Sequence, residues 1–483
     1  MRIACVNPPF IGRYSRSQRS PGVIKSGTMY YPYWLAHAVA LLEQRGHQCL
    51  LLDAPASGLG LDATLELLDD WRPGLVVLDT STPSFESDAR IAAQLKGRLS
   101  GARVVLVGTH VSALPESCLA AASPVDGVAI GEYDLTIAEL ADVLAGDGDP
   151  LDVPGLAWRA DDAIVRTAGR APIEDLDQLP WIAPVYAAQL DPRDYRFSLS
   201  GFPMAMLISG RGCPNGCFFC VYPQTMHGRR YRARSPEHVV GEMEWIERNM
   251  PTVREIVFED DTFTADESRV LAICELIRGR GLRLPWFANV RVTTGRETLR
   301  AMRDAGFRAC AVGYESGSQQ LLDEMHKGIT LERSYRFAAD AAELGVLVHG
   351  CFMVGFPGET EQTMQATLQH AIRLNPDSAQ FYPLFPYPGT EAFAWAEQHQ
   401  ALTSTDTAQW VDGQGRHRAV LSLPGLSSQR MFEFCEQASR RFHFRPRYLA
   451  KKLLQLLTRP VEGLRSLRAG LSFVRYLLGS GRG

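Results

Sequence analysis

The stretch GRGCPNGCFFCVYP, residues 210–223, begins at the end of a short apolar strand pattern and contains three of the ten cysteines of the chain. Cys213, Cys217 and Cys220 have the spacing CxxxCxxC, whereas the other seven cysteines are isolated. Three thiolates on one short loop can hold three irons of a 4Fe–4S cube and leave the fourth iron open to another ligand. The stretch therefore predicts an iron–sulfur site directly after a strand.

A zinc site is the alternative for these cysteines. Zinc sites usually have four ligands, and His227 is the nearest candidate for the fourth. Isolated cysteines such as Cys274 and Cys435 are interpreted as core residues.

Strand and helix patterns alternate on both sides of this loop. From Met204 onward, six apolar strand patterns separated by helical patterns predict a partial (β/α)6 TIM-like barrel over residues 201–400. Residues 1–145 contain five further βα units with continuous apolar strands, which predicts a doubly wound parallel sheet. Residues 146–200 are expected to be a linker with one small hairpin, and residues 401–483 a mostly helical, basic region. The fold class is thus α/β, with two domains and a helical C-terminal tail.

Composition limits the functional classes. The chain has 483 residues, 46% of them hydrophobic, and a net charge of −4, which argues against a nucleic-acid binder. No apolar run approaches the ~18 residues of a membrane span, and the N-terminus does not resemble a signal peptide, so a cytoplasmic location is expected.

The charge is uneven, because residues 440–483 contain eleven Lys or Arg and one acid, a net +10. A basic amphipathic helix in this tail can lie on an anionic membrane, which would make the protein peripheral. The alternative is a helix packed on the barrel with a solvated basic rim.

The cysteine spacing, with an aromatic residue just before the last cysteine, resembles the signature of the radical SAM superfamily. The resemblance extends over the barrel through FEDDTFT (258–264), FANVRV (287–292), VGYESGSQ (312–319) and FMVGFPGET (352–360). It implies a 4Fe–4S cluster on the three cysteines and S-adenosylmethionine (SAM) on the fourth iron. The residues that it implies for SAM binding are Phe219, Glu259, Asp260, Asp261, Arg291, Glu315, Ser316 and Gly355.

The N-terminal domain resembles the cobalamin-binding domain of one subfamily. Such domains carry a Ser/Thr pair after the third strand and a glycine element after the fourth; here these are Ser81, Thr82 and Gly108, followed by His110. The Asp-x-His-x-x-Gly element that supplies a histidine to cobalt in many cobalamin proteins is absent, so no cobalt ligand is expected from that loop. Cobalamin is implied, and a vestigial or substrate-gripping domain remains the alternative.

Three segments indicate a branch of this subfamily: residues 15–36, 79–85 and 108–117. They resemble radical SAM proteins associated with hopanoid biosynthesis and, more distantly, the anaerobic magnesium-protoporphyrin ester cyclase group. The substrate is therefore expected to be a small molecule or lipid-linked.

The resemblance implies that the reduced cluster splits SAM into methionine and a 5′-deoxyadenosyl radical, which abstracts a substrate hydrogen. An electron donor such as flavodoxin or ferredoxin would supply the electron. The outcome expected from the sequence is a rearrangement or cyclisation, partly because Thr109 replaces the second glycine of the usual pair. Cobalamin-dependent methyl transfer to an unactivated carbon is the alternative, and a non-catalytic Fe–S or zinc sensor is the alternative of another class. No catalytic residue is identified.

Overall fold

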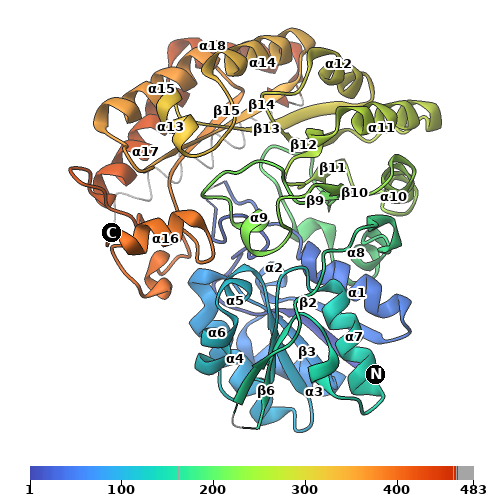
Figure 1. The fold of residues 1–483 in the computed structure, drawn as a ribbon. Coiled ribbons are helices and arrows are strands. Elements are labelled where there is room, and N and C mark those ends of the chain that lie inside the picture. The colour runs from blue at the N-terminus through green and yellow to red at the C-terminus, as the bar shows by residue number, and fades with distance from the viewer. Residues whose placement is uncertain (25, 162, 461, 464, 466–483) are drawn as a thin grey trace.

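A computed structural model describes residues 1–465 except 25, 162, 461 and 464. Figure 1 shows two α/β parts joined through the middle of the chain. The predicted fold class is confirmed, with a doubly wound domain followed by an open, barrel-like domain.

The N-terminal sheet has the strand order β2-β1-β3-β4-β5-β6-β7. Its first five strands in the chain pair in parallel, and their interiors are buried because helices cover both faces. The strands are β1 (Arg2–Asn7), β2 (Gln48–Asp53), β3 (Leu75–Asp79), β4 (Arg103–Val107), β5 (Gly127–Ala129), β6 (Leu156–Ala160) and β7 (Ala163–Arg166). The helices are α1 (Tyr33–Gln44), α2 (Ala54–Ser57), α3 (Leu61–Trp71), α4 (Phe85–Arg98), α5 (Thr109–Ala113), α6 (Pro115–Ala121) and α7 (Asp134–Ala145).

The hairpin that we expect inside the linker belongs to this sheet. Strand β6 pairs antiparallel with β5 and with β7, so the hairpin extends the sheet at its edge. Trp158 explains the attachment, since its ring is buried over Gly127, where a Cβ atom would lie 2.5 Å from it.

The second sheet has the order β15-β14-β13-β12-β11-β8, all parallel. Six strands give the predicted partial barrel. The strands are β8 (Met204–Leu207), β11 (Glu255–Phe258), β12 (Trp286–Val290), β13 (Phe307–Glu315), β14 (Leu347–Val354) and β15 (Ser378–Pro383), and β9 (Gly210–Arg211) pairs separately with β10 (Arg232–Ala233). The helices are α8 (Ala183–Gln189), α9 (Val221–Thr225), α10 (Pro236–Asn249), α11 (Glu267–Arg280), α12 (Arg296–Asp304), α13 (Gln319–Glu324), α14 (Leu331–Leu344), α15 (Glu361–Leu374) and α16 (Glu391–Gln398).

The C-terminal region is helical only from α17 (Ser428–His443) and α18 (Pro446–Thr458) onward. Residues 401–427 instead form a short 3₁₀ turn, η6 (Thr407–Trp410), and isolated β-bridges. Their Gly, Ser, Thr and Asp content favours turns over helix. None of the described helices is long and apolar enough to cross a membrane.

Candidate active site

The cysteine loop lies between the two sheets, where α9 is drawn in Figure 1. Cys213 and Cys217 are buried, and Cys220 is the residue immediately before α9. The loop depends on Gly212, whose φ is +83° and where a Cβ atom would lie 2.1 Å from the carbonyl oxygen of Arg230. A side chain at that position would force the loop to another path.

Three thiols carried on one loop are the donor set that a 4Fe–4S cluster with one open iron requires. No three cysteine, histidine or carboxylate side chains of the described residues gather around a point suited to a single metal ion. Cys213 Sγ also accepts a hydrogen bond from Asn215 Nδ2 at 3.2 Å. The residues present fit the cluster that the sequence predicts, and its assignment to these three cysteines stays a prediction.

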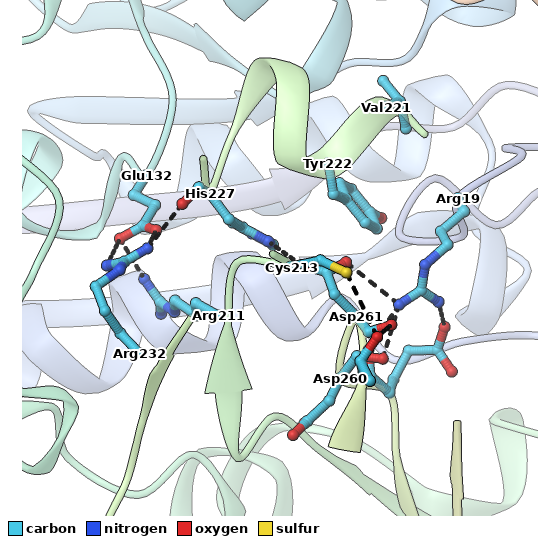
Figure 2. Close-up of polar contacts among 12 residues, drawn as sticks. Arg19, Glu132, Arg211, Cys213, Val221, Tyr222, His227, Arg232, Asp260 and Asp261 are labelled. Carbon is cyan, nitrogen blue, oxygen red and sulfur yellow. Dashed lines mark hydrogen bonds and ion pairs between the residues drawn. The ribbon is translucent and has the colours of Figure 1, made fainter. Parts of the chain in front are cut away.

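His227, the fourth ligand of the zinc alternative, belongs to no group of three metal-ligating side chains in the described part of the chain, although its Nε2 is buried there without a hydrogen-bond partner. Its Nδ1 lies 2.9 Å from Asp261 Oδ2 (Figure 2). Its ring packs against those of Trp34 and Tyr222. Burial alone would raise the pKa of Asp261, but His227 and then Arg19 outweigh it and hold that pKa below its ordinary value.

The three carboxylates after β11 have different partners. Asp260 accepts hydrogen bonds from the backbone N–H and the hydroxyl of Ser209, both at 2.6 Å, and so ties the end of β11 to the end of β8. Burial raises the pKa of Asp260 to about 6. Glu259 and Asp261 instead face Arg19. Figure 2 shows Asp261 beside the Arg19 guanidinium. The geometry therefore separates a structural carboxylate, that of Asp260, from two that face a cation.

Arg19 is the residue that sequence reasoning missed. Its guanidinium pairs with Glu259, lies 3.4 Å from Asp261 Oδ1 and donates to the carbonyl oxygen of Asp260 at 2.9 Å. It therefore occupies carboxylates that the resemblance implies for SAM binding; in that family such carboxylates receive the amino group of SAM. The signal available in the sequence was charge. Three consecutive carboxylates at the end of a buried strand, in FEDD (258–261), require a cation nearby, and the segment SRSQRS (15–20) contains two arginines.

Arg19 belongs to a segment that we call the N-terminal arm, residues 8–32. The carbonyl oxygen of Ser17 accepts hydrogen bonds from Tyr33 Oη at 2.6 Å and from Tyr222 Oη at 2.7 Å. Because Tyr222 lies on α9, two residues after Cys220, the arm is bonded to the helix that follows the cysteine loop.

The arm also reaches helix α4 of the N-terminal domain and the C-terminal region. Arg16 is fully buried and pairs with Asp88 at 2.5 Å. The backbone N–H of Val23 donates to Gly415 at 2.7 Å, and His417 Nε2 lies 2.7 Å from the carbonyl oxygen of Pro21. One segment thus connects both domains and residues 415–417.

Glu315 forms a second charged group beside the cysteine loop. It has a φ of +57°, a strained conformation for a residue with a side chain, and its Oε1 accepts a hydrogen bond from Lys327 at 2.6 Å. Burial opposes the charge on Lys327, but Glu315 and then Cys217 outweigh it and raise the pKa of Lys327. Glu315 Oε2 is buried without a hydrogen-bond partner in the described part of the chain, which leaves an acceptor available to a ligand.

Phe219 and Arg291 join this group, whereas Ser316 and Gly355 have structural partners. The Lys327 ammonium lies 5.8 Å from the Phe219 ring centroid, and Arg291 donates to the carbonyl oxygen of Lys327. Ser316 Oγ accepts from the N–H of Ser318 in a turn, and Gly355 has a φ of +100° against Met431. The predicted SAM residues are therefore brought together only in part.

The residues predicted for cobalamin cluster where β3 and β4 end. Gly108 has a φ of +118°, and a Cβ atom there would lie 2.4 Å from the carbonyl oxygen of Thr80. The Ser81 hydroxyl lies 3.0 Å from that of Tyr14, and Thr82 Oγ1 lies 3.2 Å from His110 Nδ1. Hydroxyls beside a glycine cradle fit a nucleotide tail, which would have to replace these contacts.

Two further features of this edge of the sheet are the charge state of His110 and a covering by the C-terminal region. Burial lowers the pKa of His110 to about 4, so its ring is neutral near pH 7. The 3₁₀ turn η6 packs on η1 (Thr82–Ser84), and Trp410 is fully buried there. The C-terminal region therefore covers the loop that carries Thr82.

A buried network of charged residues anchors both ends of the cysteine loop to the N-terminal domain. Arg211, two residues before Cys213, lies 2.6 Å from Asp134. It also lies 3.5 Å from Glu132 (Figure 2). Arg232 pairs with Glu132 and also donates to the carbonyl oxygen of His227 at 2.9 Å. Sequence patterns did not pair these residues, because 77 to 100 positions separate the partners.

Comparison with known families assigns both domains. Residues 207–371 match the model of the radical SAM superfamily, and residues 19–141 match that of the B12 binding domain. These two domains give the chain its cofactors, namely a 4Fe–4S cluster, SAM and cobalamin.

Curated relatives include an uncharacterized methyltransferase of Pyrococcus horikoshii, 28% identical over 91% of this chain and 94% of the relative. The anaerobic magnesium-protoporphyrin IX monomethyl ester cyclase of Rubrivivax gelatinosus is also 28% identical, over 75% of this chain and 65% of its own length.

Among solved structures, the radical SAM methyltransferase TsrM of Kitasatospora setae matches with a TM-score of 0.69 and 19% identity, over 92% of this chain and 89% of TsrM. The cobalamin-dependent SAM radical enzyme OxsB matches with a TM-score of 0.61 and 16% identity, over 90% of this chain and 61% of OxsB. At these identities the likeness concerns the fold. The chain is a radical SAM enzyme, a member of the radical SAM superfamily in which a B12-binding domain precedes the radical SAM domain.

Proposed function

We propose that this enzyme is a cobalamin-dependent methyltransferase that acts on a small-molecule substrate. The observation that carries the proposal is the contact between α9, which follows Cys220, and α5, which carries His110. In this contact the Ser112 hydroxyl of α5 lies 3.6 Å from Met226 Sδ, just after α9. The predicted cluster loop and the predicted cobalamin edge therefore adjoin in one chain, as a reaction that uses both cofactors on one substrate requires.

Bound cobalamin supplies a carrier for the methyl group, and the reduced cluster supplies the electron that splits SAM. The chain's own residues hold charges and exclude water. Glu259 and Asp261 offer carboxylates to a cation, Glu315 offers a free acceptor, and Lys327 offers an ammonium beside Cys217. Electrostatic interactions in such a buried place are stronger than in water.

The sequence favours rearrangement or cyclisation, and this expectation now has less support than methyl transfer. The methyltransferase of P. horikoshii matches over nearly its whole length, whereas the cyclase of R. gelatinosus has about a third of its length outside the match. Cyclisation remains the second candidate because the cyclases of R. gelatinosus and Cereibacter sphaeroides are both 28% identical to this chain. Either reaction needs an external electron donor, for which a flavodoxin or ferredoxin is part of the proposal.

The test is product analysis in an anaerobic assay with SAM and a chemical reductant, with cobalamin added or withheld. Methyl transfer consumes two SAM molecules, releasing S-adenosylhomocysteine from one and methionine with 5′-deoxyadenosine from the other. We expect S-adenosylhomocysteine only when cobalamin is present. 5′-Deoxyadenosine alone, unchanged by cobalamin, would reject methyl transfer and favour cyclisation.

Two variants separate the half-reactions. Cys217→Ala should stop the release of 5′-deoxyadenosine and limit S-adenosylhomocysteine to about one equivalent per bound cobalamin, because the methyl group then has no acceptor. Gly108→Val should instead stop the release of S-adenosylhomocysteine and leave that of 5′-deoxyadenosine, because its side chain would collide with Thr80 at the cobalamin edge.

A further inference from the structure

Helix α18 packs on the barrel with its polar side. Tyr448 Oη donates to the carbonyl oxygen of Asp377 at 2.9 Å, and Lys451 Nζ lies 3.0 Å from Asp377 Oδ1. Gln455 is buried one turn further on, and Arg459, just after the helix, donates to the carbonyl oxygen of Gly345 at 3.0 Å. The packing is the opposite of the usual arrangement, in which the apolar side of a helix faces the core.

The outer side of α18 is therefore apolar. Its exposed fractions are 50% for Leu449, 62% for Leu453, 59% for Leu454 and 77% for Leu457, with Phe444 at 50% immediately before the helix. We call these five residues the leucine face. They account for five of the ten large hydrophobic residues that the described chain exposes, and four lie within nine consecutive positions of one helix. A concentrated apolar patch of this kind marks an interaction site.

The charge around the leucine face is positive. Arg440, Arg441 and Arg447 are exposed beside it, and residues 437–460 contain no Asp or Glu. Glu462, the one acid further on, is paired with Arg308 and Arg465. The remaining sequence, residues 466–483, adds three arginines, four leucines and no acid.

Leucines facing outward with arginines at their rim are the composition of a helix that lies in the interface of an anionic bilayer. In Figure 1, α18 lies at the top edge of the molecule, far from the N-terminal sheet at the bottom, so this surface is not shared with the contact between the domains. We propose that the leucine face docks this enzyme on an anionic lipid surface. The proposal does not depend on which reaction the enzyme performs.

The experiment is flotation of the full chain with vesicles of phosphatidylcholine alone or with added phosphatidylglycerol. The leucine-face variant is Leu453→Glu with Leu457→Glu, both strongly exposed. The matched control is Leu67→Glu with Leu271→Glu, on α3 and α11, which are 43% and 40% exposed in other parts of the molecule.

We expect the full chain and the control to float with anionic vesicles at low salt, and to lose most of that binding at high salt. The leucine-face variant should lose at least tenfold in bound fraction while its thermal unfolding stays unchanged. Arg440→Gln with Arg441→Gln and Arg447→Gln should weaken binding and flatten its salt dependence.

The proposal fails if the leucine-face variant floats like the full chain, or if the full chain does not float with anionic vesicles. A chain that ends at residue 465 keeps the leucine face and should still bind; loss of binding there would assign the contact to residues 466–483. Dimers in solution that the leucine-face variant abolishes, without vesicle binding by the full chain, would make a second copy the occupant.

Discussion

Arg19 balances two carboxylates that are otherwise buried in the candidate active site. Its own pKa is raised, because Glu259 and Asp261 outweigh the effect of burial. If SAM places its amino group on these carboxylates, as the resemblance implies, the two cations compete for the same oxygens.

Arg19→Ala should therefore destabilise the ligand-free enzyme and tighten SAM binding by about tenfold, or ~1.4 kcal/mol. Thermal unfolding with and without SAM measures both effects. Arg230→Ala, which removes an exposed pair with Glu174, is the control and should change neither. Equal SAM affinity in Arg19→Ala and the wild type would mean that Arg19 does not occupy the amino-group site.

Asp53 gives a prediction with a defined pH dependence. Burial raises its pKa from 3.8 to about 7, despite hydrogen bonds from Asn7 and Tyr195. The folded protein therefore holds a proton that the unfolded chain releases, and stability falls as pH rises through this window. Between pH 5.5 and 7.5 Asp53 should contribute a loss of about 2 kcal/mol, and Asp53→Asn should remove that share. The share of Asp79, whose pKa burial also raises to about 7, should remain in the variant. Denaturant unfolding at the two pH values measures the change in the free energy of unfolding. An equal change in the wild type and in Asp53→Asn would contradict the prediction.

The cysteine loop is the element whose chemistry the sequence specifies most completely. Replacing all three of its cysteines by alanine should abolish the visible absorbance of thiolate-bound iron after anaerobic reconstitution. Cys274→Ala, in a buried position on α11, should keep that absorbance, because its thiol lies in the core. Full absorbance in the triple variant would show that these three cysteines do not hold the cluster.

Elements built from local patterns were predictable, and their long-range partners were not. Apolar runs and helical spacing specified the strands of both sheets, and the carboxyl ends of parallel strands meet at one edge, which located Ser81, Gly108 and Glu259. The pairing of Arg19 with Glu259 spans 240 residues and leaves no local signal. The orientation of α18 also escaped prediction, because Asp377, which holds its polar side, is distant in sequence.

At the scale of the whole molecule, Glu132 connects the two domains. It touches no cysteine, but it pairs with Arg211 before the cysteine loop and with Arg232 after it. Removing one partner of a buried charged network costs about 3–5 kcal/mol.

Glu132→Gln should accordingly lower the free energy of unfolding by about 3 kcal/mol and reduce the iron retained on reconstitution. Glu139→Gln is the control, because it removes the partly exposed pair with Arg170 in the same domain. Iron content and unfolding are both measured; normal iron with lowered stability would limit Glu132 to a structural role.

The arm has a consequence for the order in which the enzyme is completed during synthesis. The N-terminal sheet is finished once β7 has been made, but His417, which bonds the arm at Pro21, is 396 residues further along the chain. Trp410, which covers the loop with Thr82, is made equally late. A B12-binding domain that folds before then would have its cofactor edge uncovered. We therefore expect the cofactor to bind most easily to the incomplete chain during synthesis. In the finished protein it has to displace contacts that the last quarter of the sequence makes.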